Sequence, residues 1–240
     1  MHPDSFAEWF LTFHEPFYNV LSDDGNFILN IKDRVVKGTR HRFVWKTVMA
    51  LEDAGWHAID DYLWHKTNPM PGYWPNRLRD GWEYCFHLAK IKRPFMNQDA
   101  IKQPIGDWAD VRLKDLNGKS AARHNSQNES GFGRDLRKWV GKDSVLPSNV
   151  LSLPLVGVNR GHPAVFPIGL PEFFIKLMSP ENGIILDPFG GSGTTAIASL
   201  NLGRSCIIID NNKEYCQTAV ELIQKDVRKK NYEIKKIGFN

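Results

Sequence analysis

The sequence has few cysteines and no long apolar run. Its 240 residues include only Cys85, Cys206 and Cys216, and no C-x-x-C pair. Scattered cysteines form neither a disulfide framework nor a cysteine-based zinc site, so we expect a protein of the reducing cytoplasm without a metal. No apolar run reaches the roughly 18–20 residues that span a bilayer, and no signal-peptide pattern opens the chain. We therefore expect no membrane partner.

The composition is that of a globular protein with a mild excess of positive charge. Apolar residues make up 42% of the chain and charged residues 24%, which are ordinary values for a folded domain. The formal charge is +4 and the isoelectric point is about 8.9. This charge is compatible with a nucleic-acid partner but does not by itself distinguish one from an ordinary soluble protein.

Periodicity and turn residues predict an α/β protein. Apolar residues at helical spacing predict helices over residues 4–20, 42–54, 170–179, 194–202 and 212–227. Short β-prone runs predict strands over residues 27–31, 57–66, 83–90, 183–187 and 205–210. The prolines and glycines of residues 67–81 predict a loop. The alternation of strands and helices after residue 149 predicts a parallel sheet with helices on its faces.

A polar insertion separates the two halves of the chain. Residues 91–148 are polar, and hydrophobic periodicity is lost from about 115 to 135. A structureless segment of this length within a domain is usually functional or disordered. We therefore divide the chain into residues 1–90, an inserted region 91–148, and residues 149–240.

The most informative segment is a glycine-rich turn between a strand and a helix. DPFGGSGTT (187–195) follows an apolar strand, and a helix begins at once. Glycines permit a tight turn and the close approach of a ligand, while the helix start offers unpaired amides. Asp210 ends the next strand, where an acid can accept both hydroxyls of a ribose.

A dinucleotide-binding dehydrogenase is an alternative interpretation of this turn. Its G-x-G-x-x-G pattern would place a third glycine where the chain has Ala196, a residue sometimes tolerated there. Asp187 at the tip of the strand argues against it, because a carboxylate would repel a pyrophosphate but can face an ammonium group.

The turn resembles the cofactor motif of bacterial DNA methyltransferases that modify adenine N6 or cytosine N4. HPAVFPIGLPEFFIKLM (162–178) resembles the family's helix-capping cofactor motif, which precedes the glycine turn only in the permuted "beta" arrangement. The resemblance implies a doubly wound, Rossmann-like S-adenosylmethionine-dependent methyltransferase fold, circularly permuted. It implies cofactor contacts from Asp187, Phe189, Gly191, Ser192, Gly193, Thr194, Asp210, His162, Pro163 and Phe166.

The resemblance also places a target-recognition region in the insertion. Cations there can grip phosphates, and neighbouring amides can read base edges. We expect DNA contacts from Arg112, Lys119, Arg123, Arg134, Arg137 and Lys138. Interleaved carboxylates leave open that the segment is only a solvated loop.

The family's catalytic loop, Ser/Asp/Asn-Pro-Pro-Tyr/Phe, is missing from the sequence. In the family it orients the amine of a flipped base towards the methyl group. NPMPGY (68–73) breaks the spacing, and Glu15-Pro16-Phe17 lies within a predicted helix. We therefore assign no catalytic residue, and expect an N-terminally incomplete fold that lacks two central strands and is inactive and poorly folded alone. A misassigned start, a separate chain with the loop and a degenerate remnant are the three explanations.

The sequence thus predicts a restriction–modification DNA methyltransferase that acts on cytosine N4 in double-stranded DNA, with adenine N6 as the alternative. A non-catalytic DNA-binding subunit that retains the cofactor fold is the alternative from another class. No pattern in the sequence predicts the recognition sequence, the oligomeric state or the presence of a cognate restriction enzyme.

Overall fold

The structure, a computed structural model, describes residues 2–107, 113, 122–123, 134–135, 139–157, 165–228 and 231–238. The chain divides into two units, each described by itself below. The larger unit combines residues 1–97 with 148–240, and the smaller one spans residues 98–147.

The chain begins with three short helical segments in place of the single helix expected over residues 4–20. They are η1 (Pro3–Ser5), α1 (Phe6–Leu11) and α2 (His14–Val20). At the break, the Thr12 hydroxyl donates a hydrogen bond to the carbonyl of Trp9 at 2.7 Å. Pro16 lacks an amide hydrogen, and its ring disfavours a continuous helix through the carbonyl of Thr12. The prediction of one helix was therefore wrong at this point.

Four strands of the larger unit form a mixed sheet in the order β1-β5-β4-β10. Their bounds are β1 (Asn26–Ile31), β4 (His57–Lys66), β5 (Trp82–Ala89) and β10 (Val150–Leu153). β5 is antiparallel to both β1 and β4, whereas β10 is parallel to β4. Loop 67–81 joins β4 directly to β5, and such a short connection makes neighbouring strands antiparallel. The parallel sheet expected from the sequence concerns the strands after residue 149.

Helix α3 (Phe43–Asp53) packs on this sheet. Its apolar residues Val44, Val48 and Leu51 share a buried cluster with Phe86 and Leu88 of β5. The helix ends before Gly55, whose φ of 104° stops the helical path. These elements match the predictions for residues 42–54, 57–66 and 83–90.

A small hairpin not predicted from the sequence precedes α3. Its strands are β2 (Arg34–Val36) and β3 (Thr39–His41), which pair antiparallel. Lys37 and Gly38 form the turn with φ values of 49° and 79°. Two consecutive residues with positive φ are typical of the tight turns that match strand twist.

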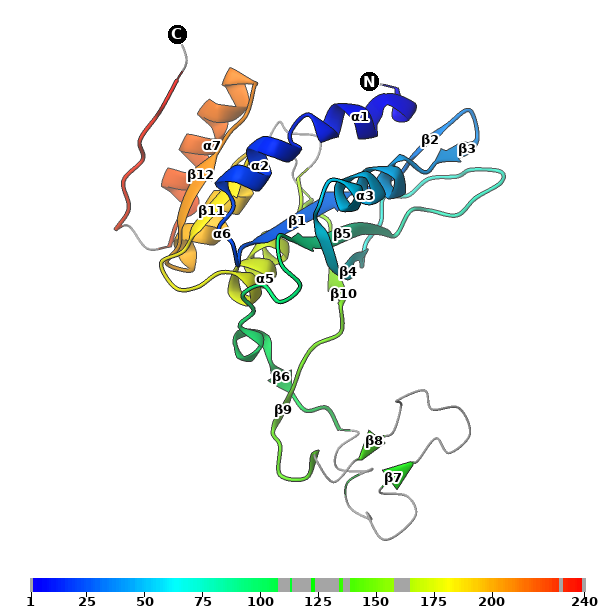
Figure 1. The fold of residues 1–240 in the computed structure, drawn as a ribbon, viewed down its shortest axis with the longest axis vertical. Coiled ribbons are helices and arrows are strands. Elements are labelled where there is room, and N and C mark those ends of the chain that lie inside the picture. Colours follow the sequence, from blue (N-terminus) through cyan, green and yellow to red (C-terminus); the bar gives the residue numbers. More distant parts are fainter. Residues whose placement is uncertain are drawn as a thin grey trace. The chain divides into compact units, whose positions relative to one another are not determined.

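The C-terminal half alternates helices and strands as expected. In chain order the elements are α5 (Gly169–Met178), β11 (Ile184–Asp187), α6 (Thr194–Asn201), β12 (Ser205–Ile208) and α7 (Lys213–Asp226). β11 and β12 are parallel and form a separate two-stranded sheet among the described residues. Figure 1 shows α6 and α7 beside this sheet, and their apolar residues pack with Cys206 and Ile208.

The smaller unit contains short elements. Residues Gln98–Ile101 form η2, β6 (Gln103–Pro104) pairs with β9 (Ser144–Val145), and β7 (Ala122–Arg123) pairs with β8 (Arg134–Asp135). Across the described parts of both units, no helix is long and apolar enough to cross a membrane.

Candidate functional site

The glycine-rich turn links the end of β11 to the start of α6. Gly191 and Gly193 adopt φ values of 49° and 81°, in the left-handed region that favours glycine. The amide of Gly193 donates to the carbonyl of Gly190 at 2.8 Å, which closes the turn. A Cβ added at position 190 would lie 2.8 Å from the Cβ of Ile208. The turn therefore lies directly against β12, and its glycines are required by space as well as by conformation.

The carboxylate of Asp187 holds this turn from the β11 side. One oxygen accepts a hydrogen bond from the amide of Phe189 at 3.1 Å, and the other accepts from the hydroxyl of Thr195 at 2.6 Å. A negative charge beside the first turn of α6 is also favoured by the helix dipole. Each carboxylate oxygen can accept a second hydrogen bond, so Asp187 retains capacity for a donor of a ligand.

Asp210, which follows β12, holds the turn from the other side. One of its oxygens accepts from the amide of Gly191 at 2.9 Å, and the other accepts from the amide of Asn212 at 2.8 Å. Asn212 in turn caps α7 by accepting from the amide of Glu214 at 2.8 Å. The carboxylate is therefore fixed in direction, and its remaining lone pairs are available to hydroxyl groups.

Polar donors at the start of α6 remain available. The amides of Ser192 and Thr194 make no hydrogen bond with any described residue. Such unpaired amides at a helix start attract an anionic group. Together with two oriented carboxylates and a turn that contains three glycines, they suit a ligand that carries hydroxyls, an ammonium group and a carboxylate, as S-adenosylmethionine does.

Behind the turn, Cys206 of β12 is a packing residue. Burial raises the pKa of its thiol to about 12, so the thiol is protonated at neutral pH. It packs beside Ile208 against α6 and α7. A protonated, buried thiol is unreactive.

Phe189 is surrounded by aromatic rings from the N-terminal helices. Its ring centroid lies 5.5 to 6.5 Å from four others. The four rings, here called the aromatic cluster, belong to Trp9, Phe10, Phe13 and Phe17. Phe189 is still 50% exposed to solvent, so one side of its ring can contact a ligand. The cluster links the glycine turn to α1 and α2.

The structure thus brings together most of the residues predicted for cofactor binding. Asp187, Phe189, Gly191, Ser192, Gly193, Thr194 and Asp210 all lie in or beside the turn. Phe166 is half-buried just before α5, where the carbonyl of Pro167 accepts from the amide of Leu170. His162 and Pro163 lie outside the described residues. The cofactor contacts of all ten predicted residues remain predictions.

Sequence reasoning assigned no role at the site to Thr195, Asn212 or the aromatic cluster. The hydroxyl of Thr195 and the backbone amide of Asn212 orient the two carboxylates. A local signal existed for Asn212, because asparagine before a helical run is a common N-cap. No local signal connects the aromatic cluster to a turn more than 170 residues later.

The predicted DNA-binding residues lie in the smaller unit. Arg123 of β7 and Arg134 of β8 are register partners. Arg112, Lys119, Arg137 and Lys138 lie outside the described residues. DNA binding by all six remains a prediction. Within the described part of the chain, no three His, Cys, Asp or Glu side chains gather as metal ligands.

A comparison with known families identifies the chain. Residues 2–221 match the family described as DNA methylase. The chain belongs to the DNA methylase family. The family resemblance inferred from the glycine turn and the helix-capping motif is therefore confirmed.

Several characterised relatives of this DNA methylase are type II methyltransferases. The chain is 25% identical over 234 residues to type II methyltransferase M.PvuII of Proteus hauseri, covering 88% of this chain and 68% of the relative. It is 29% identical over 179 residues to M.SmaI of Serratia marcescens, covering 75% of this chain and 50% of the relative. The DNA methylase chain thus spans between half and about two thirds of these two relatives.

Solved structures support the fold of the DNA methylase. The PvuII DNA methyltransferase, described as cytosine-N4-specific, aligns with a TM-score of 0.68 at 19% identity, covering 97% of this chain and 74% of that chain. The M1.HpyAVI–SAM complex aligns with a TM-score of 0.55 at 24% identity, covering 89% and 80%. At these identities the likeness establishes a shared mixed α/β fold.

Proposed function

We propose that this DNA methylase chain is the cofactor- and DNA-binding part of a restriction–modification DNA methyltransferase. The observation that carries the proposal is the glycine turn, which two carboxylates hold from opposite sides and which leaves helix-start amides unpaired. The cofactor is S-adenosylmethionine, which supplies an electrophilic methyl group. The acceptor is the exocyclic amino group of a base in duplex DNA.

Each residue of the turn has a distinct binding task. Asp210 accepts the hydroxyls of the ribose, and Asp187 faces the methionine ammonium. Ser192 and Thr194 donate to the methionine carboxylate, while Gly191 and Gly193 allow close approach. Phe189 presents its exposed ring side to the cofactor, and His162, Pro163 and Phe166 line the methionine end.

The proposed target is cytosine N4, with adenine N6 as the alternative. Support comes from the name of the PvuII structure, which is described as cytosine-N4-specific. The same family pattern serves both bases, so the choice requires a chemical analysis of the methylated product.

The catalytic loop is proposed to lie on polypeptide beyond these 240 residues, in a permuted order with the glycine turn late in the chain. That polypeptide is either an upstream segment or a separate chain. Among the described strands, β1 is an edge strand of the four-stranded sheet, and β11 pairs only with β12. Each of these two strands therefore has an edge without a described partner, to which a strand of the added polypeptide would pair.

The uncovered face of the β11–β12 sheet supports this incompleteness. This face carries large apolar side chains that are exposed to solvent, and Ile184 is 70% exposed. They are Ile184, Leu186, Ile207 and Ile209. Contiguous exposed apolar side chains on a sheet mark a surface that binds other protein. The polypeptide that carries the loop would cover them.

DNA recognition is proposed for the insertion. Residues 91–148 would follow the duplex with Arg112, Lys119, Arg123, Arg134, Arg137 and Lys138, while the target base is flipped out of the stack towards the cofactor. The flanking segments 1–90 and 149–240 would form the methyltransferase domain.

The decisive experiment is complementation. The chain is co-expressed with a polypeptide that carries the loop and adjoining strands of a type II relative, and tritiated methyl transfer to DNA is measured. Nucleoside mass spectrometry then distinguishes N4-methylcytosine from N6-methyladenine. We expect transfer only when both parts are present. Transfer by residues 1–240 alone would refute the proposed location of the loop.

The intact mass of the protein expressed from its native locus separates the two sources of the loop. A mass clearly above 27.5 kDa indicates an upstream segment, which should contain the Pro-Pro-aromatic loop. A mass of 27.5 kDa leaves a separate chain that carries the loop, a non-catalytic binding subunit or a degenerate remnant. Stable DNA binding without any transfer after complementation would instead favour the non-catalytic subunit.

A further inference from the structure

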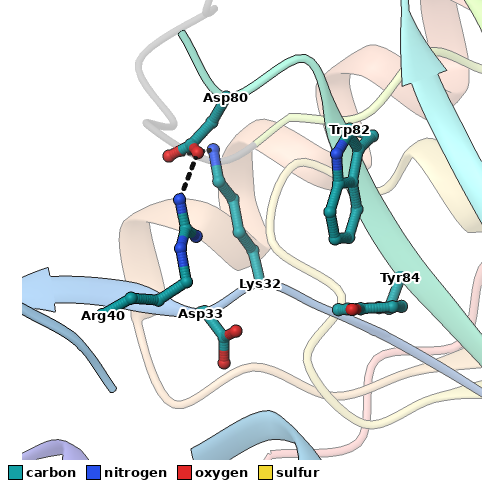
Figure 2. Close-up of a pocket in the computed structure, with 6 residues that line it drawn as sticks. All are labelled: Lys32, Asp33, Arg40, Asp80, Trp82 and Tyr84. Atoms are coloured by element: carbon teal, nitrogen blue, oxygen red, sulfur yellow. Dashed lines mark hydrogen bonds and ion pairs between the residues drawn. The ribbon is translucent and has the colours of Figure 1, made fainter. Parts of the chain in front are cut away.

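The β2–β3 hairpin and the loop after β4 lie side by side at one end of the larger unit. Arg40 of β3 forms an ion pair with Asp80 of the loop at 2.6 Å, and Lys32 approaches the same carboxylate at 3.4 Å. Figure 2 shows both cationic side chains reaching Asp80. A third cation, Arg77, lies 3.6 Å from it within the loop. We call residues 32–42 and 67–81 together the basic edge.

Positive charge is concentrated on the basic edge. It contains seven lysines and arginines against two carboxylates, and therefore carries a net charge of +5, whereas the whole chain carries +4. The rest of the chain is thus slightly negative. Clustering of cations on one surface, rather than a high total charge, is the electrostatic footprint of a nucleic-acid site.

Both carboxylates of the basic edge lie beside cations of the same edge. Partial burial raises the pKa of Asp80, but hydrogen bonds and charges from Arg40 and Lys32 outweigh this effect, so its pKa lies below the usual value. Asp33 has a side chain only 4% exposed and lies 3.7 Å from Arg42. The acids therefore organise the hairpin and loop and offer little negative charge to solvent.

Three further cations of the basic edge are exposed and lack an ion pair with any described residue. They are Arg34 on β2, Lys37 in the hairpin turn and Arg79 in the loop. A cation without a protein partner can bind a phosphate without first breaking an ion pair. Tyr73 and Leu78 of the same loop are 89% and 90% exposed. The loop therefore presents apolar and aromatic side chains to solvent beside its cations.

We propose that the basic edge binds the phosphate backbone of duplex DNA through Arg34, Lys37 and Arg79. This inference rests on the proposed function and adds a contact surface outside the insertion 91–148. The contacts are to phosphates, so they position the duplex and carry no sequence information. Clustered cations also speed the encounter with DNA at low ionic strength.

The test measures the salt dependence of DNA binding by the 240-residue chain. Fluorescence anisotropy with a labelled duplex of about 30 bp gives Kd at KCl concentrations from about 50 to about 300 mM, over which affinity changes strongly when phosphate contacts contribute. The variant R34Q/K37Q/R79Q removes the three cations. The matched control K225Q/R228Q/K236Q removes three exposed cations in and after α7, and R34K/K37R/R79K keeps the charge. S-adenosylmethionine binding is measured on every preparation.

We expect the affinity of the neutralised variant to be about ten- to hundred-fold lower near 100 mM salt. The plot of the logarithm of the association constant against the logarithm of the salt concentration should become shallower by roughly 0.9 per lost phosphate contact. The control and the charge-keeping variant should retain the parent slope. A parent-like slope in the neutralised variant, or an equal loss in the control, overturns the proposal. No DNA binding by the parent overturns it too. Loss of S-adenosylmethionine binding alone counts against the proposed function and leaves this surface standing.

Discussion

The carboxylate of Asp210 accepts a hydrogen bond from the amide of Gly191 at 2.9 Å and thereby ties the end of β12 to the glycine turn. Its second oxygen accepts from the amide of Asn212 at 2.8 Å. One side chain therefore fixes the backbone on both sides of the proposed ribose position. A change at Asp210 should affect both the fold of the turn and the binding of the cofactor.

Asp210→Asn should weaken S-adenosylmethionine binding by about ten- to hundred-fold. The substitution replaces one acceptor oxygen with an NH2 donor, and this donor would point at a backbone amide that is itself a donor. The free energy of unfolding should fall by about 1–3 kcal/mol. Calorimetric titration and urea unfolding measure the two effects. The control Glu214→Gln changes an exposed carboxylate in the first turn of α7 and should leave binding unchanged. Equal effects of both substitutions would contradict the role of Asp210.

Three glycine substitutions should separate crowding from backbone strain. Gly203 has a φ of 74° with no atom within 4 Å of an added Cβ, so Gly203→Ala should cost about 1 kcal/mol from strain alone. Gly193→Ala adds a contact of 3.1 Å with Ala219 to a similar φ and should cost more. In Gly190→Ala the new Cβ would lie 2.8 Å from the Cβ of Ile208, and the free energy of unfolding should fall by about 2–3 kcal/mol.

Urea unfolding of the three variants gives this order directly. Only Gly190→Ala and Gly193→Ala should also weaken cofactor binding, since Gly203 follows α6, away from the turn. An unfolding free energy for Gly190→Ala equal to that of the parent would show that the turn does not lie against β12.

His87 should make stability depend on pH. Burial lowers its pKa to about 4, although the charge of Asp60 opposes the shift. Asn26 uses its amide nitrogen to donate to the carbonyls of Phe95 and Met178, so its oxygen accepts from Nε2 of His87 at 2.7 Å. The buried Nδ1 of His87 has no partner among the described residues. The neutral ring is therefore the form that suits the folded chain.

The unfolded chain binds more protons at this histidine between about pH 6.5 and pH 4. The contribution is fully present above pH 6.5 and is lost as the pH falls towards 4, by roughly 3 kcal/mol at most. Urea unfolding across this window measures the slope. His87→Gln keeps a donor for Asn26 without the titration and should show a shallower slope. An unchanged slope in the variant would assign the pH dependence to other groups.

Phe13 and Phe189 should stabilise each other, because their ring centroids lie 5.5 Å apart in an edge-to-face arrangement. A double-mutant cycle with Phe13→Ala and Phe189→Ala should give a coupling of about 0.5–1.5 kcal/mol. A cycle between Phe13 and Tyr84 serves as the control, because the aromatic neighbours of Phe13 among the described residues do not include Tyr84. Coupling near zero in the first cycle would mean that α1 and α2 do not support the turn.

The family and the glycine turn were accessible from the sequence because their signals are local. The turn needs glycines at fixed positions, and the strand and helix around it show periodicities that survive without any long-range contact. Helices α3, α5, α6 and α7 were found for the same reason, each with an apolar face or a cap within one segment. The family match over residues 2–221 confirms the resemblance drawn from these motifs.

Tertiary structure alone decided how these pieces meet. The antiparallel pairing of β1 with β5, the hydrogen bond between Gly191 and Asp210, and the aromatic cluster around Phe189 all join separate segments of the chain. The basic edge likewise depends on the ion pair that brings a hairpin to a loop 40 residues later. Local patterns select each element, whereas the energies of pairing and packing, which involve distant segments, select their arrangement.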